Sequence, residues 1–100
     1  MSISEKVRHY ADLYDVDAGK MEKTMLCEST GSTTIQSMHR DPTGPNGRED
    51  SWGLVQIHLP SHPEVTREKA QDPDFALEFM AKEFAKGHTW KWTCYKSNAS

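Results

Sequence analysis

The chain is organised around residues 17–31, which read DAGKMEKTMLCESTG. An N-cap at Asp17, an apolar stripe and a helix stop at Gly31 predict a helix over residues 18–29. The expected buried stripe consists of Met21, Met25 and Leu26. Glu28 therefore falls in the last turn of this helix, close to its apolar side.

A carboxylate in that position is unfavourable for two reasons. The helix dipole opposes negative charge at a C-terminus by roughly 0.3–1 kcal/mol, and apolar neighbours oppose the ionised form further. Both effects raise the pKa of Glu28, and a glutamate that keeps its proton near neutral pH can act as a general acid. The alternative is a solvated glutamate at a helix end, with no chemical role.

Two more long helices are expected on either side of this segment. Ser2 and Glu5 have the spacing of a capping box, with a stripe formed by Ile3, Val7, Tyr10 and Tyr14. Near the C-terminus, a helix is expected to start after Asp72, which precedes a proline, and to end before Gly87. Its core face consists of Phe75, Phe79, Met80 and Phe84. A shorter helix is expected over residues 66–70.

The middle of the chain has a different character. Residues 30–50 are rich in glycine, proline and other turn formers, and within them residues 33–36 predict a short strand, one arm of a hairpin. Asp50 or Ser51 can cap a short helix over residues 52–57, with a strand as the alternative.

Together these elements predict one small, mainly α-helical domain over residues 1–100, of the α+β type, with a glycine-rich loop or short hairpin lobe. Hydrophobic residues make up 35% of the chain, enough for a modest core. No apolar run of about 18 residues occurs, so we expect no membrane span. The net charge of −3 argues against nucleic acid as a partner, and the lysines near the C-terminal aromatic residues, Lys91 and Lys96, are too few to change that.

The two cysteines, Cys27 and Cys94, lie far apart in the sequence. A disulfide between them would stabilise the fold by roughly 4 kcal/mol on the chain-entropy model, and two separate buried thiols are the alternative. The histidines and cysteines lack the spacing of a zinc site, so we expect no metal and no other cofactor.

Three short blocks in order carry a resemblance to a known family. They are Cys27-Glu28-Ser29, residues 51–57 with the sequence SWGLVQI, and residues 72–77 with the sequence DPDFAL. Together they resemble the lysozyme-like superfamily, in particular the branch of soluble lytic transglycosylases and goose-type lysozymes. The resemblance covers roughly residues 18–95.

The resemblance implies a muramidase that cleaves the β-1,4 bond between N-acetylmuramic acid and N-acetylglucosamine in peptidoglycan, with Glu28 as general acid. Ser29 would then bond near Glu28 or the sugar, and Ser51 and Gln56 would line the cleft. Gly53 would let the backbone approach the glycan, or it is simply a packing glycine.

The C-terminus departs from the family pattern, which usually ends in a helix with a tyrosine followed by asparagine, alanine and glycine. Tyr95 is the candidate for that tyrosine, but the asparagine and glycine are missing here. Trp90 and Trp92 either stack on sugar faces or are core aromatics.

A second carboxylate would allow hydrolysis by water, and Asp50 is the first candidate, followed by Glu49 and then Asp41. Without one, Glu28 would act first as acid and then as base on the 6-hydroxyl of the muramic acid, which gives a 1,6-anhydro product. The sequence leaves these two outcomes open.

Two other functions compete with the muramidase: a lysozyme-like module that binds peptidoglycan without cleaving it, and a small helical domain that binds another protein. The N-terminus has no signal-peptide pattern. We therefore expect delivery to the cell wall or periplasm by another route, as for a phage enzyme, or as a domain of a larger secreted protein. The chain is expected to act as a monomer or as part of a larger assembly.

Overall fold

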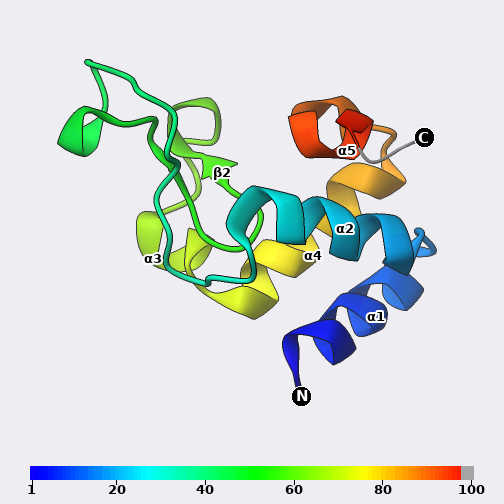
Figure 1. Cartoon of the computed structure of the whole chain (residues 1–100). Helices are drawn as coiled ribbons and strands as arrows, with labels where there is room; N and C mark the ends of the chain where they lie inside the picture. The colour runs from blue at the N-terminus through cyan, green and yellow to red at the C-terminus, as the bar shows by residue number, and fades with distance from the viewer. Residues whose placement is uncertain (98–100) are drawn as a thin grey trace.

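The structure is a computed structural model that describes residues 1–97 (Figure 1). Its helices are α1 (Ile3–Tyr14), α2 (Ala18–Ser29), α3 (Arg67–Ala70), α4 (Pro73–Ala85) and α5 (Thr93–Ser97). Three single 3-10 turns are η1 (Pro45–Gly47), η2 (Leu59–Ser61) and η3 (Thr89–Lys91), and the two strands are β1 (Ser51–Trp52) and β2 (Ile57–His58). The predicted class, mainly α with a small hairpin lobe, is confirmed.

The N-terminal helix begins as its sequence predicts. The Ser2 hydroxyl accepts a hydrogen bond from the Glu5 amide, and the Glu5 carboxylate accepts one from the Ser2 amide. Val7 is buried against the core, and Tyr10 bonds to Asp74 at the start of α4. Helix α1 thus packs along α4, as Figure 1 shows.

Helix α4 is the centre of the core. It begins where the sequence predicts, because the Asp72 side chain accepts a hydrogen bond from the Asp74 amide and Pro73 occupies the first position. Gly87 lies just beyond its end with a φ of 80°. Four residues on one side of α4 are fully buried: Ala76, Leu77, Met80 and Ala81. Of the predicted core face, Met80 and Phe84 are buried, while Phe75 and Phe79 are partly buried against the core.

Helix α2 has the predicted bounds, but one residue of its predicted stripe is wrong. Met21 and Met25 are buried, whereas Leu26 is 47% exposed. Thr24 is also buried. Its hydroxyl donates a hydrogen bond to the Lys20 carbonyl, so this buried polar group has a partner within the helix. Leu26 is about 100° around the helix from Met25, which turns it away from the core.

The expected helix over residues 52–57 is wrong, and the alternative, a strand, is present only at its two ends, with a turn over residues 53–56. Strands β1 and β2 pair antiparallel, with Ser51 opposite His58 and Trp52 opposite Ile57. Gly53 has a φ of 83° at the start of the turn between them, which no helix contains. The turn therefore decides the local structure, despite the apolar spacing.

A further arm pairs with β1 and extends the lobe. Bridges join Gln36 to Trp52 and Arg40 to Arg48, so the strand predicted for residues 33–36 is present only as a bridge at its last residue. The Gln36 amide nitrogen donates to the Pro45 carbonyl, and Arg48 donates to the carbonyls of Gln36 and Ser37. These bonds hold the lobe, seen at the left of Figure 1, without a large apolar core of its own.

Cys27 and Cys94 form a disulfide with a Cα–Cα distance of 5.9 Å, which resolves the two alternatives. It joins the end of α2 to α5 across 67 residues of sequence. Within residues 1–97, no helix has both the length and the apolar character needed to cross a membrane.

Candidate active site

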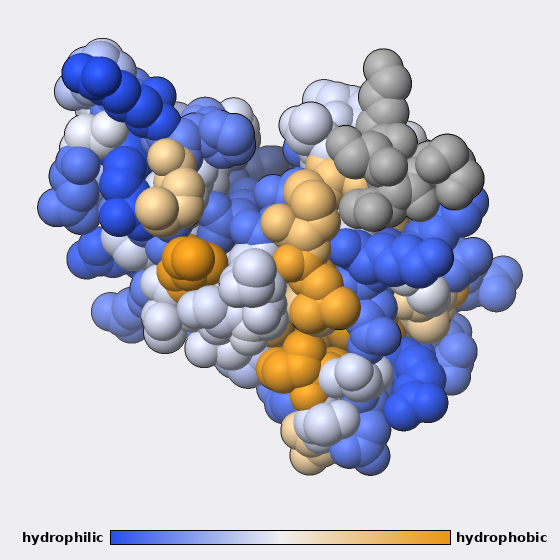
Figure 2. All heavy atoms as spheres, in the orientation of Figure 1, coloured by the Kyte–Doolittle hydropathy of each residue, from blue (hydrophilic) through white to orange (hydrophobic). Residues whose placement is uncertain are grey.

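A cleft of about 550 Å³ lies between the lobe and the C-terminal segment. Figure 2 shows the surface notched between the hydrophilic lobe and the opposite wall. The lobe and the η2 region line it through Glu49, Gln56, Ile57, His58, Ser61 and His62. The other lining residues are Phe79, Trp90, Lys91, Trp92 and Thr93.

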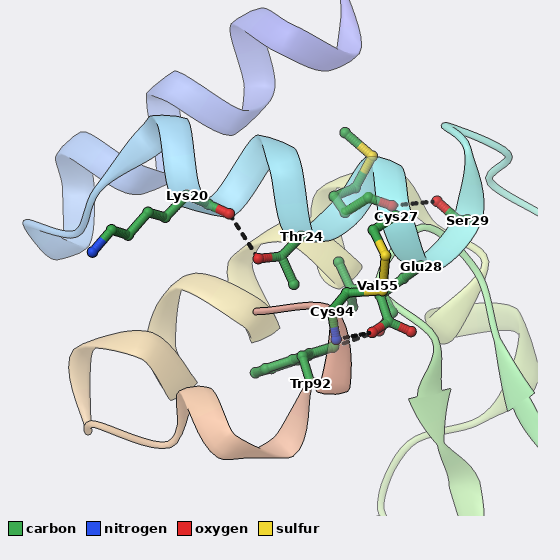
Figure 3. Close-up of a disulfide and its surroundings, with 9 residues drawn as sticks. Lys20, Thr24, Cys27, Glu28, Ser29, Val55, Trp92 and Cys94 are labelled. Carbon is green, nitrogen blue, oxygen red and sulfur yellow. Dashed lines mark hydrogen bonds between the residues drawn. A yellow bond between two sulfur atoms is a disulfide. The ribbon is translucent and has the colours of Figure 1, made fainter. Parts of the chain in front are cut away.

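Glu28 is not among the residues that line this cleft, but it lies beside the cleft wall. Its Oε2 accepts a long hydrogen bond of 3.4 Å from the backbone N–H of Cys94, the residue after Thr93 in the cleft wall. Figure 3 shows the Glu28 side chain projecting from the end of α2 toward Cys94 and Trp92. The disulfide of the preceding residue, Cys27, fixes the donor and the acceptor of this bond to each other.

The surroundings of Glu28 raise the pKa of its carboxyl. Burial is the largest cause, because it penalises the charged form, and the negative charge of Glu49 acts in the same direction. The Cys94 amide and the charge of His39 lower the pKa but do not cancel the effect of burial. The sequence-based expectation of a raised pKa is therefore confirmed, although burial contributes most.

Two side-chain hydrogen bonds order the polar residues just before and within β1. Glu49 and Asp50 precede the strand, and each bonds to the residue two positions later. The Ser51 hydroxyl donates to Glu49 at 2.7 Å, and the Trp52 indole donates to Asp50 at 2.7 Å, each between residues two apart. His39 lies across from Glu49 in the neighbouring arm, where its carbonyl accepts from the Glu49 amide.

Of the candidate second carboxylates, Glu49, the second candidate from the sequence, lines the cleft, and Asp50 does not. The Asp50 side chain instead accepts a hydrogen bond from the indole of Trp52. Asp41, the third candidate, is bonded to Thr43 within a turn of the lobe.

Two serines expected at the substrate are instead buried. Ser29 is 1% exposed, and its hydroxyl donates to the Met25 carbonyl and accepts from the Gly31 amide. Ser51 is also 1% exposed and bonds to Glu49. Neither can touch a ligand; Ser29 shapes the helix end behind Glu28, and Ser51 orients Glu49.

Gln56 lines the cleft as expected, but its amide nitrogen donates to the carbonyls of Ile35 and Gly53. Its Oε1 takes part in neither of these bonds. Gly53 is a packing glycine, because a Cβ there would lie 1.9 Å from the Ala70 carbonyl oxygen. The alternative for Gly53, close approach of a glycan to its backbone, is therefore not needed to explain the residue.

The aromatic residues at the C-terminus have three different environments. Tyr95 packs edge-on against Phe84, with Lys20 over its ring, and is not among the cleft residues. Trp92 is 4% exposed and donates to the Val55 carbonyl at 2.7 Å. Trp90 is 74% exposed at the cleft. Of these three aromatic residues, only Trp90 is largely exposed at the cleft.

Sequence reasoning missed five polar residues of the cleft: His58, Ser61, His62, Lys91 and Thr93. A signal for His58 was present in the strand alternative for this segment, because the hairpin pairs His58 with Ser51. His62 and Lys91 reach the cleft only through the packing of η2 and η3 around it. No cluster of three or more His, Cys, Asp or Glu side chains within residues 1–97 is arranged to bind a metal ion.

Comparison with protein-family models, with curated proteins and with solved structures found no match to this chain.

Proposed function

We propose that the protein is a muramidase that cleaves the bond between N-acetylmuramic acid and N-acetylglucosamine in peptidoglycan, with Glu28 as general acid. The observation that carries the proposal is a half-buried carboxyl with a raised pKa beside the wall of an open cleft. The substrate class comes from the resemblance of the Glu28, 51–57 and 72–77 blocks to the lytic transglycosylase and goose-type lysozyme branch.

The first step is proton transfer. Protonated Glu28 gives its proton to the glycosidic oxygen as the bond from that oxygen to the anomeric carbon breaks, and the developing positive charge spreads over the sugar ring. The raised pKa keeps the proton on Glu28 closer to neutral pH. The Cys94 N–H then bonds to the carboxylate that remains.

The role of Glu49 determines whether the second step is attack by water or by the 6-hydroxyl of the sugar. Glu49 lines the cleft, its charge acts on Glu28, and the Ser51 hydroxyl fixes its orientation. As a general base it would remove a proton from water attacking the anomeric carbon, which gives a reducing end. Without that role, Glu28 would take the proton of the 6-hydroxyl and the product would be a 1,6-anhydro sugar. We assign the position of the second carboxylate to Glu49 in place of Asp50.

The test is digestion of purified peptidoglycan, with mass spectrometry of the released muropeptides. Glu28→Gln keeps the shape of the side chain but cannot donate a proton, so product release is expected to fall about 10²–10⁴-fold. Glu68→Gln, an exposed glutamate on α3, is the matched control and is expected to retain full activity. Activity of the parent should fall as the pH rises through the raised pKa of Glu28.

Glu49→Gln separates the two chemistries. Loss of reducing-end products in this variant would identify a hydrolase with Glu49 as base, whereas unchanged release of anhydro products would identify a lytic transglycosylase. If the parent releases no muropeptides in either oxidising or reducing buffer, the muramidase proposal is overturned. Retained binding to peptidoglycan in that case would identify the non-cleaving module.

A further inference from the structure

We infer that Trp90 is the stacking platform of a saccharide subsite in the wall of the cleft, and that the ring it receives is a pyranose of an N-acetylated glycan strand. The inference deepens the proposed function and rests on it for the choice of ligand. It is carried by the exposure of Trp90, by its place in the cleft and by the residues that hold it there.

The exposure of Trp90 is unusual for so large an apolar side chain. Trp52 and Trp92 are 7% and 4% exposed and both indole N–H groups have partners, whereas Trp90 is 74% exposed. It lies in a cleft lined by both apolar side chains, such as Phe79 and Ile57, and polar ones, such as Glu49 and His58. An exposed aromatic ring in a cleft of mixed polarity fits a ligand with both apolar faces and polar edges, and a sugar ring has both.

One buried carboxylate, that of Glu83, holds the segment that carries Trp90. Glu83 is 8% exposed, and its two oxygens bind residues on either side of Trp90: His88 Nδ1 at 2.6 Å and Lys91 Nζ at 3.2 Å. Burial alone would raise the pKa of Glu83, but the hydrogen bonds from His88 and Lys91 lower it overall. The carboxylate therefore stays ionised and holds the η3 turn in place.

The same two residues also lie near the indole while leaving most of it exposed. Lys91 Nζ lies 5.9 Å from the ring centroid of Trp90, and the His88 ring lies 6.0 Å away at a tilt of 56°. A platform whose support is already formed loses little conformational entropy when a sugar stacks on it. Trp90 lies four residues before Cys94, whose N–H bonds to Glu28, so one short segment carries both the exposed ring and the hydrogen-bond partner of the acid.

The experiment uses Glu28→Gln as the parent, so that ligand is bound without turnover, and the tetramer of N-acetylglucosamine as the probe. Because Trp90 is the one exposed tryptophan of the three, glycan binding is expected to shift its emission to shorter wavelength and to protect it from acrylamide quenching. In the same background, Trp90→Ala is expected to raise Kd about tenfold and Trp90→Phe about threefold.

Leu13→Ala is the matched control, because Leu13 is 59% exposed on α1 and does not line the cleft. It is expected to leave Kd unchanged. In the active enzyme, Trp90→Ala should raise KM with kcat within about twofold, since a variant that only displaced Glu28 would lower kcat.

Three results would overturn the inference: no binding of the tetramer by the parent, binding without any change in emission or quenching, or the same Kd in parent and Trp90→Ala. A change of oligomeric state in Trp90→Ala with unchanged Kd would assign Trp90 to a protein contact. The binding result does not depend on cleavage. If the protein binds the tetramer through Trp90 but releases no muropeptides, the subsite inference stands and the muramidase proposal is overturned.

Discussion

The two walls of the cleft are built by different means. The lobe wall, residues 35–58, is held by backbone pairing and by side chains such as Gln36 and Arg48 that bond to nearby carbonyls. The C-terminal wall, residues 89–95, has little pairing of its own and is held from a distance by the disulfide and by the Glu83 contacts. Short-range hydrogen bonds therefore order the carboxylates of the lobe wall, and long-range bonds decide where the hydrogen-bond partner of Glu28 lies.

The largest expected effect comes from removing the covalent anchor of the C-terminal wall. The double variant Cys27→Ser and Cys94→Ser is expected to lose about 4 kcal/mol in free energy of unfolding, because the closed loop no longer restricts the unfolded chain. Urea unfolding measures this loss in free energy of unfolding. Wild type kept fully reduced should give the same value, and a loss below about 1 kcal/mol would show that packing alone holds α5.

The next effect tests how the lobe docks on the helices. Gly53→Ala is expected to cost about 3 kcal/mol, because a Cβ meets the Ala70 carbonyl oxygen and the positive φ disfavours alanine. Gly47→Ala is the control: its φ is 70° with nothing within 4 Å of the added Cβ, so about 1 kcal/mol is expected. Equal losses in the two variants, measured by thermal unfolding, would contradict the close contact with α3.

A smaller effect tests the hydrogen bond that joins the two walls. Trp92→Phe leaves the Val55 carbonyl without its indole donor, and a loss of about 1–2 kcal/mol is expected. Trp90→Phe is the matched control on the exposed tryptophan and should stay within about 0.5 kcal/mol of wild type. Chemical denaturation of both variants checks the difference, which would vanish if the Trp92 bond contributed nothing.

The smallest effect concerns the ionisation of Glu28. Since folding raises its pKa, ionisation is less favourable in the folded protein, and stability falls as the pH rises from the ordinary value of 4.5 through the raised one. Glu28→Gln should thus be more stable than wild type at alkaline pH, by about 0.5 kcal/mol because the side chain is partly solvated. The difference should disappear at acid pH. A stability difference that stays constant at every pH would show that it does not come from the titration of Glu28.

Local patterns predicted the helices well, because caps and stops act within a few residues. Asp17, Asp72 and the Ser2 capping box all work as expected. The errors arose where apolar spacing was ambiguous: Leu26 is exposed, and residues 52–57 form a hairpin instead of a helix. In the second case, the positive φ of Gly53 was a stronger local determinant than the pattern around it.

The candidate site was predicted only in part. Glu28 and its raised pKa follow from its place in the last turn of α2, and the resemblance supplied a substrate class. The resemblance also suggested Ser29 as a ligand contact, but that serine is buried and bonded to its own helix end. Choosing between Glu49 and Asp50 required the packed lobe, because only the tertiary structure shows that Glu49 lines the cleft and that Asp50 bonds to the Trp52 indole.

The sequence by itself determined helices α1, α2 and α4 and the place of a glutamate in the last turn of α2, because each depends on interactions a few residues apart. Only the tertiary structure decided that Cys27 and Cys94 meet, that Glu49 lines the cleft, and that Trp92 is buried while Trp90 is exposed. Those outcomes depend on contacts between residues far apart in the chain, such as Trp92 with Val55 and Cys94 with Glu28. No local pattern contains them, because they exist only once the lobe and α5 have packed on opposite sides of the cleft.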